Sequence, residues 1–337
     1  MPSRAVPPRL TAVSPRLACP GGLIHIAGHD LFGDDRALPH VTIGATAARV
    51  TAASPARLVV AIPDDCPGGD WPVAIDDDDS LDVTIGRILA TGVHQVDSPV
   101  IDRFGRIYAT FSGSRGQQVP VSIFRLGPTP AREPFSSSVL NPTSMAIGPD
   151  GSLYVSSRFE GTVSRVSDDG SAVVVVSNVG IACGLAFAPD GALYVGDRSG
   201  TIFRANVETG DATVVASLPP SVAAFHLAFG PDGFLYVTGP TLSPTDRVHR
   251  VDPSSGRVET VFQGFGRPQG LAFDAQGVLH VADALAGAGG IFRIEEGEAR
   301  LAVAGTRLVG VAFDGDGGLV AASSDTLYRF DAVSSAS

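Results

Sequence analysis

A unit of about forty residues recurs six times in the second part of the chain, and this repetition constrains the fold more than any other feature. Its clearest copy, residues 181–210, reads IACGLAFAPDGALYVGDRSGTIFRANVETG. Three apolar runs, GLAFA, ALYVG and TIFRA, are separated by turn-forming segments, and a fourth run, ATVVASL, follows them. Four antiparallel strands repeated at this spacing are typical of the blades of a β-propeller.

The copies can be aligned on the glycine that closes the first turn of each unit. These glycines are Gly105, Gly151, Gly191, Gly233, Gly277 and Gly317. The third run of every copy carries an arginine, namely Arg125, Arg165, Arg204, Arg250, Arg293 and Arg329. Because the repeat itself explains these arginines, we interpret them as structural. Large and small side chains alternate in the runs, so the large face of one blade can pack on the small face of the next.

The sixth copy has only three runs and ends near Phe330. Its missing outer strand has a counterpart upstream, because residues 87–93, RILATGV, resemble the outer runs VVVVSNV and RLAVAGT. A ring that closes in this way leaves no exposed sheet edge at the junction. We therefore predict a six-bladed propeller over residues 87–332, closed by this N-terminal strand, with a tail at 333–337. Residues 1–84 are expected to be dispensable for its stability.

Residues 1–86 lack the repeat and contain short alternating runs separated by turn signals, a pattern typical of an immunoglobulin-like β-sandwich. The whole chain is therefore expected to be all-β. Runs such as IHIAG, VTIGATAARV and RLVVAIP resemble the IPT/TIG domain family, and this resemblance covers residues 8–86. It implies a spacer or interaction module beside a larger domain, with no chemistry of its own.

The three cysteines bear on the compartment. Cys19 and Cys66 both precede Pro-Gly and, in such a sandwich, would lie in loops at the same end. A disulfide between them is one alternative, and two reduced thiols are the other; Cys183 has no evident partner. The N-terminus lacks the apolar core of a signal peptide, and no apolar run could span a membrane. A cytoplasmic protein is expected as written, or an extracellular or periplasmic one if the disulfide forms or a leader was removed.

Charge excludes one class of partner. The net charge is −11 and the sequence has no basic cluster, which argues against nucleic-acid binding. All 24 basic residues are arginine, which we attribute to the compositional bias of a bacterial genome. We expect a monomer that binds a small molecule or a protein partner.

Residues 268–283, PQGLAFDAQGVLHVAD, resemble the NHL repeat, and residues 88–332 are also similar to the gluconolactonase and regucalcin group of six-bladed propellers. That group carries a divalent metal at the mouth of the ring, so the resemblance implies Ca²⁺ or Zn²⁺ as cofactor. Its first ligand, a Glu before Gly-Pro-Val-Trp, matches Asp97 before Ser-Pro-Val-Ile. The other ligand positions match Thr143, Cys183, Phe225, Gln269 and Val309, none of which is Asp, Glu or Asn. This depleted set argues against lactonase activity, because such ions need several ligands.

Polar residues gather where the inner strands are expected to begin and to converge on the ring axis. They are Gln95, Asp97, Asn141, His226, Arg267, Gln269 and Arg307. His226 stands where the other copies have Ser or Gly. A pair of His226 with Asp97 could perform acid–base chemistry, or His226 could be satisfied by backbone. Arg267 and Arg307 suit a carboxylate or another anionic group, or are plain surface arginines.

Two functions follow from these observations. The first is a binding or scaffold protein that presents a propeller face, with long loops at 112–120, 239–246 and 283–290, to a small molecule or protein. The alternative is a gluconolactonase-like hydrolase or lyase that uses Asp97 and His226 at the axial mouth. The missing metal ligands favour binding.

Overall fold

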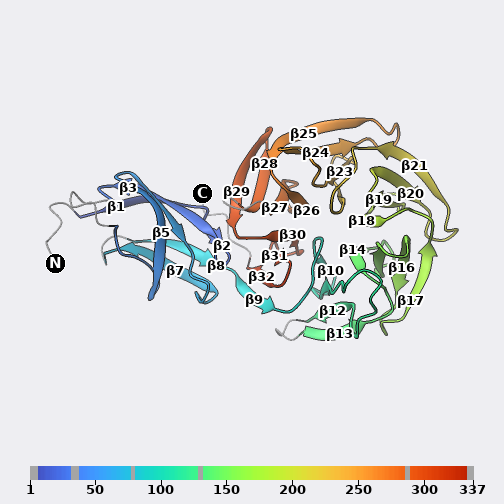
Figure 1. Cartoon of the computed structure of the whole chain (residues 1–337), viewed down its shortest axis with the longest axis horizontal. Helices are drawn as coiled ribbons and strands as arrows, with labels where there is room; N and C mark the ends of the chain where they lie inside the picture. The colour runs from blue at the N-terminus through green and yellow to red at the C-terminus, as the bar shows by residue number, and fades with distance from the viewer. Residues whose placement is uncertain (1–6, 32–37, 77–79, 128–131, 285–288, 332–337) are drawn as a thin grey trace.

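The computed structural model describes residues 7–31, 38–76, 80–127, 132–284 and 289–331. These residues form strands β1 to β32 and no helix, so the all-β prediction is confirmed for them. Accordingly, they contain no helix that could cross a membrane. Figure 1 shows β1 to β8 on one side and the remaining strands arranged in sheets around a common centre, as in a propeller. The predicted tail at 333–337 lies outside the described residues.

Five separate four-stranded sheets form most of the ring, each with its strands antiparallel and in the order of the repeat. Their bounds are β10 (Val100–Ile101), β11 (Ile107–Thr110), β12 (Ile123–Leu126), β13 (Arg132–Ser136); β14 (Pro142–Ile147), β15 (Leu153–Ser157), β16 (Thr162–Val166), β17 (Ala172–Val176); β18 (Ala182–Phe187), β19 (Leu193–Asp197), β20 (Thr201–Ala205), β21 (Ala212–Ser217); β22 (His226–Phe229), β23 (Leu235–Thr238), β24 (Asp246–Val251), β25 (Val258–Phe265); β30 (Leu308–Phe313), β31 (Leu319–Ser323), β32 (Leu327–Phe330) and β9 (Arg87–Ala90).

The remaining repeat forms β26 (Pro268–Phe273), β27 (Leu279–Asp283), β28 (Gly290–Glu295) and β29 (Glu298–Ala304). These strands pair in the same antiparallel order, but they belong to a twelve-stranded sheet that also contains β1 to β8. The repeats predict six separate blades, whereas five sheets are separate. The difference arises because β2 of the N-terminal region pairs with β29.

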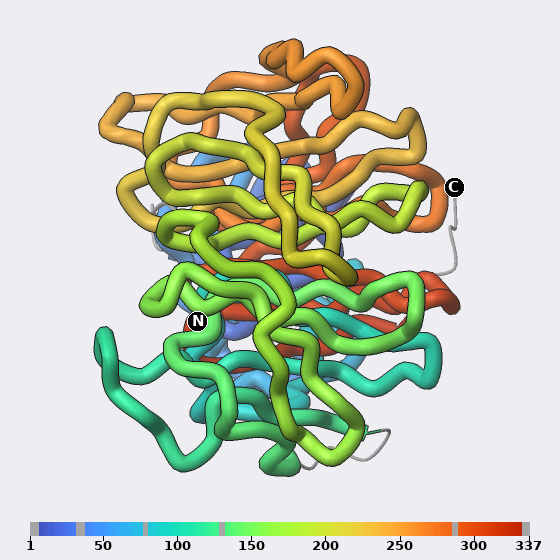
Figure 2. The backbone as a smooth tube through the Cα atoms, turned by 90° about the vertical axis from the view of Figure 1, so that its right-hand side faces the viewer, coloured from blue at the N-terminus to red at the C-terminus, as the bar shows by residue number. Residues whose placement is uncertain are grey.

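The ring is closed by contacts between neighbouring inner strands. These contacts join β10, β14, β18, β22, β26 and β30 in this order, and β30 in turn contacts β10. Figure 2 shows the ring from the side, with successive sheets stacked on one another. A tyrosine of one sheet meets a phenylalanine of the next edge-on, as in the Tyr154–Phe187 pair at 4.9 Å and the Tyr236–Phe273 pair at 5.0 Å. The predicted packing of large faces between repeats is thus realised by aromatic pairs.

The strand-three arginines also follow the repeat. Each one forms an ion pair with a nearby carboxylate: Arg125–Glu133, Arg165–Asp150, Arg204–Asp190, Arg250–Glu259, Arg293–Glu295 and Arg329–Asp314. These contacts support their interpretation as structural residues.

The predicted closing strand is confirmed. β9 lies antiparallel to β32, with Ala90 opposite Leu327 and Ile88 opposite Tyr328. The chain enters this pairing through Gly86, where an added Cβ would lie 2.7 Å from the Phe330 ring. A residue without a side chain is therefore needed at position 86, so that β9 can pair with β32 as the fourth strand of the last sheet.

The N-terminal strands are β1 (Arg9–Ser14), β2 (Leu17–Ala18), β3 (Leu23–His29), β4 (Val41–Ile43), β5 (Thr46–Ser54), β6 (Arg57–Ala61), β7 (Gly69–Ile75) and β8 (Ser80–Ile85). Their order in the sheet is β1-β3-β6-β5-β4-β7-β8-β2. Side chains alternate between core and surface along β3, where Ile24 and Ile26 are buried, and Val73 and Val83 from β7 and β8 belong to the same core. The alternation predicted for these runs is therefore present.

Strand β2 connects this region to the ring. It lies parallel to both β8 and β29, with Leu17 opposite Thr84 on one side and Val303 on the other. Just beyond it, the Cys19 backbone N–H donates to Ala304 O at 2.7 Å.

Of the two alternatives for Cys19 and Cys66, the structure has the free thiols and not the disulfide, and Cys183 is free as well. Cys19 packs with Val303 and Phe330 in a cluster of the ring, whereas Cys66 packs in the core of the N-terminal strands. The two thiols belong to different cores, so the shared end of a sandwich does not bring them together.

Candidate functional site

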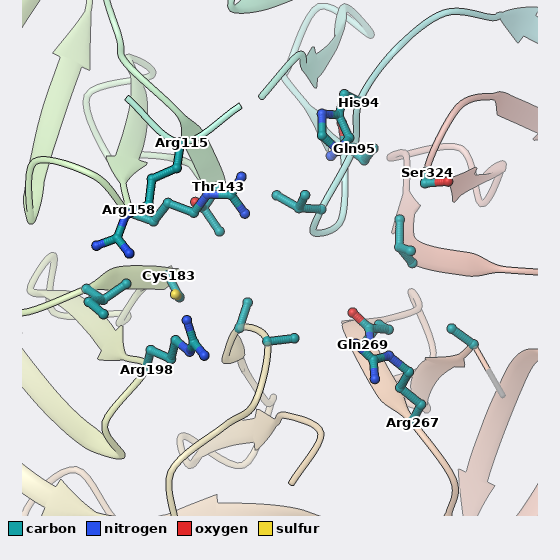
Figure 3. Close-up of a pocket in the computed structure, with 16 residues that line it drawn as sticks. His94, Gln95, Arg115, Thr143, Arg158, Cys183, Arg198, Arg267, Gln269 and Ser324 are labelled. Carbon is teal, nitrogen blue, oxygen red and sulfur yellow. The ribbon is translucent and has the colours of Figure 1, made fainter. Parts of the chain in front are cut away.

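A cavity of about 430 Å³ lies where the inner strands begin. Thr143, Cys183, Gln269 and Val309 line it from the second position of β14, β18, β26 and β30. The ring geometry explains this convergence, because equivalent strand positions face the same axis. Figure 3 shows the cavity with its polar side chains projecting from several sheets.

Three arginines that the sequence analysis did not single out line this cavity, namely Arg115, Arg158 and Arg198. Arg158 and Arg198 occupy the same place in consecutive repeats, directly after β15 and β19. Their backbone N–H groups donate to Asn141 O and Ile181 O, which fixes both residues at the head of an inner strand. The sequence does contain a feature that could have indicated them, because two copies of the repeat have an arginine at the same position. That position lies in segments whose sequence indicates only turns.

The guanidinium groups of these arginines have no carboxylate partner in the described part of the chain. Arg158 donates from Nη2 to Ser112 Oγ at 3.1 Å, and Arg198 donates from Nε to Ser221 O at 3.4 Å. Burial lowers the pKa of the Arg158 guanidinium, and the positive charges of Arg115 and Arg198 lower that pKa further. One wall of the cavity thus carries three guanidinium groups that form no ion pair with the described residues.

The structure separates the two arginines that were predicted to bind a ligand. Arg267 lines the cavity, whereas Arg307, at the matching position of the next repeat, does not. Gln269 lines the cavity and is 6% exposed, which agrees with its predicted place at the mouth. Arg307 has a positive φ of 54° and an exposed side chain, so it belongs to the surface.

Gln95 lines the cavity, but its amide is engaged within the protein. Its Nε2 donates to Asp97 O at 2.8 Å, and its Oε1 accepts from the Thr110 N–H at 2.8 Å. Asn141 does not line the cavity. Its Nδ2 donates to Gly113 O and Ser114 O, so it holds the loop that carries Arg115. The prediction that Asn141 faces a ligand is corrected to a positioning role, because its amide is consumed by this loop.

His226 and Asp97 form a hydrogen bond, with 2.7 Å between His226 Nδ1 and Asp97 Oδ1. Asp97 Oδ1 also accepts from the Ser98 N–H at 2.6 Å. β10, which follows Asp97, and β22, which carries His226, are three places apart in the cycle of inner strands, so the bond spans the inside of the ring. The alternative of a histidine satisfied by backbone does not hold in this structure.

Both members of this pair lie below the cavity. His226 is fully buried, Asp97 is 5% exposed, and neither is part of the cavity lining. His226 follows Phe225, so it lies one residue further along its strand than the position that lines the cavity in other sheets. Its Nε2 is buried and finds no partner among the described residues. The pair has the chemistry of an acid–base dyad, but its free nitrogen is not exposed to the cavity.

The residues at the mouth do not fit the divalent metal that the gluconolactonase resemblance implies. No group of three or more His, Cys, Asp or Glu side chains suited to a metal occurs in the described ranges. Asp97 already accepts two hydrogen bonds. Burial raises the pKa of the Cys183 thiol to about 12, so this side chain remains protonated and is a poor ligand.

No family model matches the chain, and no curated protein matches it. Among solved structures, an auxiliary nutrient binding protein from Bacteroides thetaiotaomicron VPI-5482 is 14% identical, with 97% of this chain and 98% of that chain covered and a TM-score of 0.58. A gluconolactonase from Xanthomonas campestris is 14% identical, with coverages of 86% and 97% and a TM-score of 0.60.

Virginiamycin B lyase from Staphylococcus aureus is 16% identical, with 92% of this chain and 99% of that chain covered and a TM-score of 0.51. Likeness at such low identity concerns the fold alone, since one fold supports many activities. The 97% coverage by the nutrient binding protein means that its similarity extends over β1 to β8 as well as the ring. The chain is therefore an all-β protein whose ring is similar in fold to gluconolactonase-like propellers.

Proposed function

We propose that this protein binds a small molecule in the cavity at the mouth of the ring. The observation that carries the proposal is the cavity itself, whose 430 Å³ falls within the usual range of small-molecule sites. Its lining comes from several sheets of a closed ring, which holds the polar groups in fixed positions. A similar fold in a nutrient binding protein supports a binding role in general terms.

The proposed architecture is a six-bladed propeller that follows an immunoglobulin-like module of the IPT/TIG kind. The cyclic contacts of the inner strands support counting β26 to β29 as a blade. The shared core of β3, β4, β6 and β7 supports a distinct module before it. The proposed domains are 1–86 and 87–332.

The test compares ligand binding by the parent protein with binding by a variant whose cavity is filled by a larger side chain. Isothermal titration calorimetry with a panel of neutral polyols, sugar acids, sugar phosphates, amino acids and amines should find at least one ligand. Ala223→Trp places a large side chain at a cavity-lining position and should abolish that binding. Ala56→Trp, at an exposed turn of the N-terminal region, is the matched control and should bind normally. Binding that survives Ala223→Trp would locate the site elsewhere.

A second candidate function is hydrolysis or elimination at the mouth, with His226 and Asp97 as acid and base. The 2.7 Å hydrogen bond between them favours it. Binding alone is favoured over it because His226 Nε2 is enclosed by protein. Gluconolactone hydrolysis by the purified protein, lost in His226→Gln, would establish the second function instead.

A further inference from the structure

The cavity has two chemically different sides. Figure 3 shows Arg115, Arg158 and Arg198 on one side, together with Thr143 and Cys183. The opposite side presents His94, Gln95, Arg267, Gln269 and Ser324. A ligand that filled the cavity would therefore meet concentrated positive charge at one end and mainly neutral polar groups at the other.

The arginines of the three-arginine side differ from those of the third strands. The net charge of the chain is −11, and all six strand-three arginines are paired with carboxylates. Arg115, Arg158 and Arg198 instead reach one cavity from three successive repeats, and none of them forms an ion pair with a carboxylate of the described residues. Like charges brought together at a partly enclosed site repel one another, and a bound anion would relieve that repulsion.

The donors available on this side exceed the needs of a single carboxylate. A guanidinium has five N–H donors, and one arginine suffices to hold a carboxylate through two of them. Arg158 and Arg198 each use a single donor group toward the protein, on Ser112 and Ser221. Three guanidinium groups therefore match a group with two negative charges and several acceptor oxygens.

The opposite side is suited to hydroxyl groups. The side-chain amide of Gln269 forms no hydrogen bond with the described residues, so both its donor and its acceptor can serve a ligand. Ser324 adds an exposed hydroxyl at the cavity wall.

From this arrangement we infer that the ligand is a small polyhydroxylated molecule with a dianionic group. The dianion lies against Arg115, Arg158 and Arg198, and the hydroxyl groups lie against Gln269 and Ser324. The shared chemistry is that of a sugar phosphate or a sugar dicarboxylate. This inference rests on the proposed function, which places the ligand in the cavity.

The test titrates the full chain with ligands that differ stepwise in charge. Sorbitol, gluconate and glucarate share one carbon skeleton and carry no, one and two negative charges, and ribose is compared with ribose phosphate. Calorimetry should detect glucarate or ribose phosphate, with affinity falling at least tenfold for each charge removed. Whichever of these two dianions binds more tightly shows whether the site prefers a phosphate or two carboxylates. Affinity should also fall as salt is added.

Arg158→Gln and Arg198→Gln should each weaken binding of the preferred dianion at least tenfold. Arg307→Gln is the matched control, because it removes the same charge at the repeat position of Arg267 but outside the cavity. Its affinity should stay within about twofold of the parent protein. Circular dichroism of each variant checks that the fold is retained.

Several results would overturn the inference. One is sorbitol or ribose binding as tightly as its charged counterpart, and another is an unchanged affinity in a folded Arg158→Gln variant. Equal affinity for inorganic phosphate and ribose phosphate would overturn the role of Gln269 and Ser324. If a neutral or cationic compound binds and Ala223→Trp abolishes it, the dianion inference fails while the proposed function stands. If no compound of either panel binds, both fail.

Discussion

At the scale of single residues, the hydrogen bond between His226 and Asp97 joins β22 to the segment before β10, on the opposite side of the ring. Both side chains are buried in the folded protein. A buried polar group that loses its partner destabilises the folded state by its desolvation. The pair therefore contributes to the stability of the ring whether or not it takes part in chemistry.

Replacing His226 by Ala should lower the free energy of unfolding by about 1–3 kcal/mol, because the Asp97 carboxylate loses its hydrogen bond. Asp97→Ala should be similarly destabilising. In the double variant the two losses should not add, since they remove the same interaction. Urea unfolding of the four proteins measures this coupling. Additive losses would show that the two side chains act independently.

His280 illustrates what the repeat predicts well. Four other copies have tyrosine at its position, and its ring meets Phe313 at 4.8 Å much as three of those tyrosines meet a phenylalanine of the next sheet. Arg158 and Arg198 illustrate what the repeat conceals. Their positions also match between copies, but a turn segment gives no indication that its side chains point into the ring. Convergence on an axis depends on three-dimensional packing, and the spacing of residues in one chain does not specify it.

A pH dependence follows from His280. Burial lowers its pKa from the ordinary value of 6.5, because the charged ring is disfavoured in the folded protein. The unfolded chain then binds the proton more readily, so this residue destabilises the fold as pH falls below about 6.5. His280→Tyr should reduce the loss of melting temperature between pH 7 and pH 5 relative to the parent protein. Identical pH profiles for both proteins would contradict this account.

At the scale of elements, neighbouring sheets contact each other through the turns between their third and fourth strands. Gly170, between β16 and β17, approaches the backbone of β13, where an added Cβ would lie 2.0 Å from Phe135 O. Gly256, between β24 and β25, approaches Val215 O in the same way, at 2.1 Å. A hairpin turn of one sheet thus lies directly on the outer strand of the previous sheet.

This contact predicts different effects for two glycines of similar backbone conformation. Gly170 and Gly105 have φ of 83° and 74°, but nothing lies within 4 Å of a Cβ at Gly105. Gly170→Ala should lower stability by about 1–3 kcal/mol more than Gly105→Ala, because only the former forces the sheets apart. Thermal unfolding of both variants tests the difference. Equal losses would assign the whole effect to backbone strain.

The strands of the repeats were predictable because each copy gives the same pattern independently. The pairing of β9 with β32 was also predictable, since one repeat lacks a strand and one segment upstream resembles it. The attachment of β2 to β29 was not, because a strand of two residues, Leu17–Ala18, has no periodicity to recognise. The choice between a disulfide and free thiols could not be made from the sequence for a related reason, since Cys19 follows β2 onto the ring.

At the scale of the whole molecule, β1 to β8 and the ring share hydrogen-bonded strands. Leu17 and Cys19 pack in a cluster with Ile291 and Val303, so the N-terminal region covers part of the ring. The sequence predicts that residues 1–84 can be removed without loss of stability. The structure corrects this expectation, because their removal would uncover the outer edge of β29.

Deleting residues 1–84 should therefore lower the stability of the ring by at least about 2 kcal/mol, from the lost burial around Leu17 and Cys19. Deleting residues 1–94 should lower it further, because β9 is lost as well. Differential scanning calorimetry of the full chain and the two shortened proteins measures the order of melting temperatures. A shortened protein lacking residues 1–84 that melts with the full chain would show that β2 adds nothing to the ring.

The hydrogen bond between His226 and Asp97 has one more consequence, for how a ligand would enter and leave the cavity. Because His226 and Asp97 meet on the inside of the ring and are both buried, we expect their hydrogen bond to narrow the axis beyond the cavity. A ligand bound beside Arg115 and Arg158 is then expected to enter and leave on the side of the cavity away from this pair. The rates of ligand binding and release would then depend on the loops around that opening.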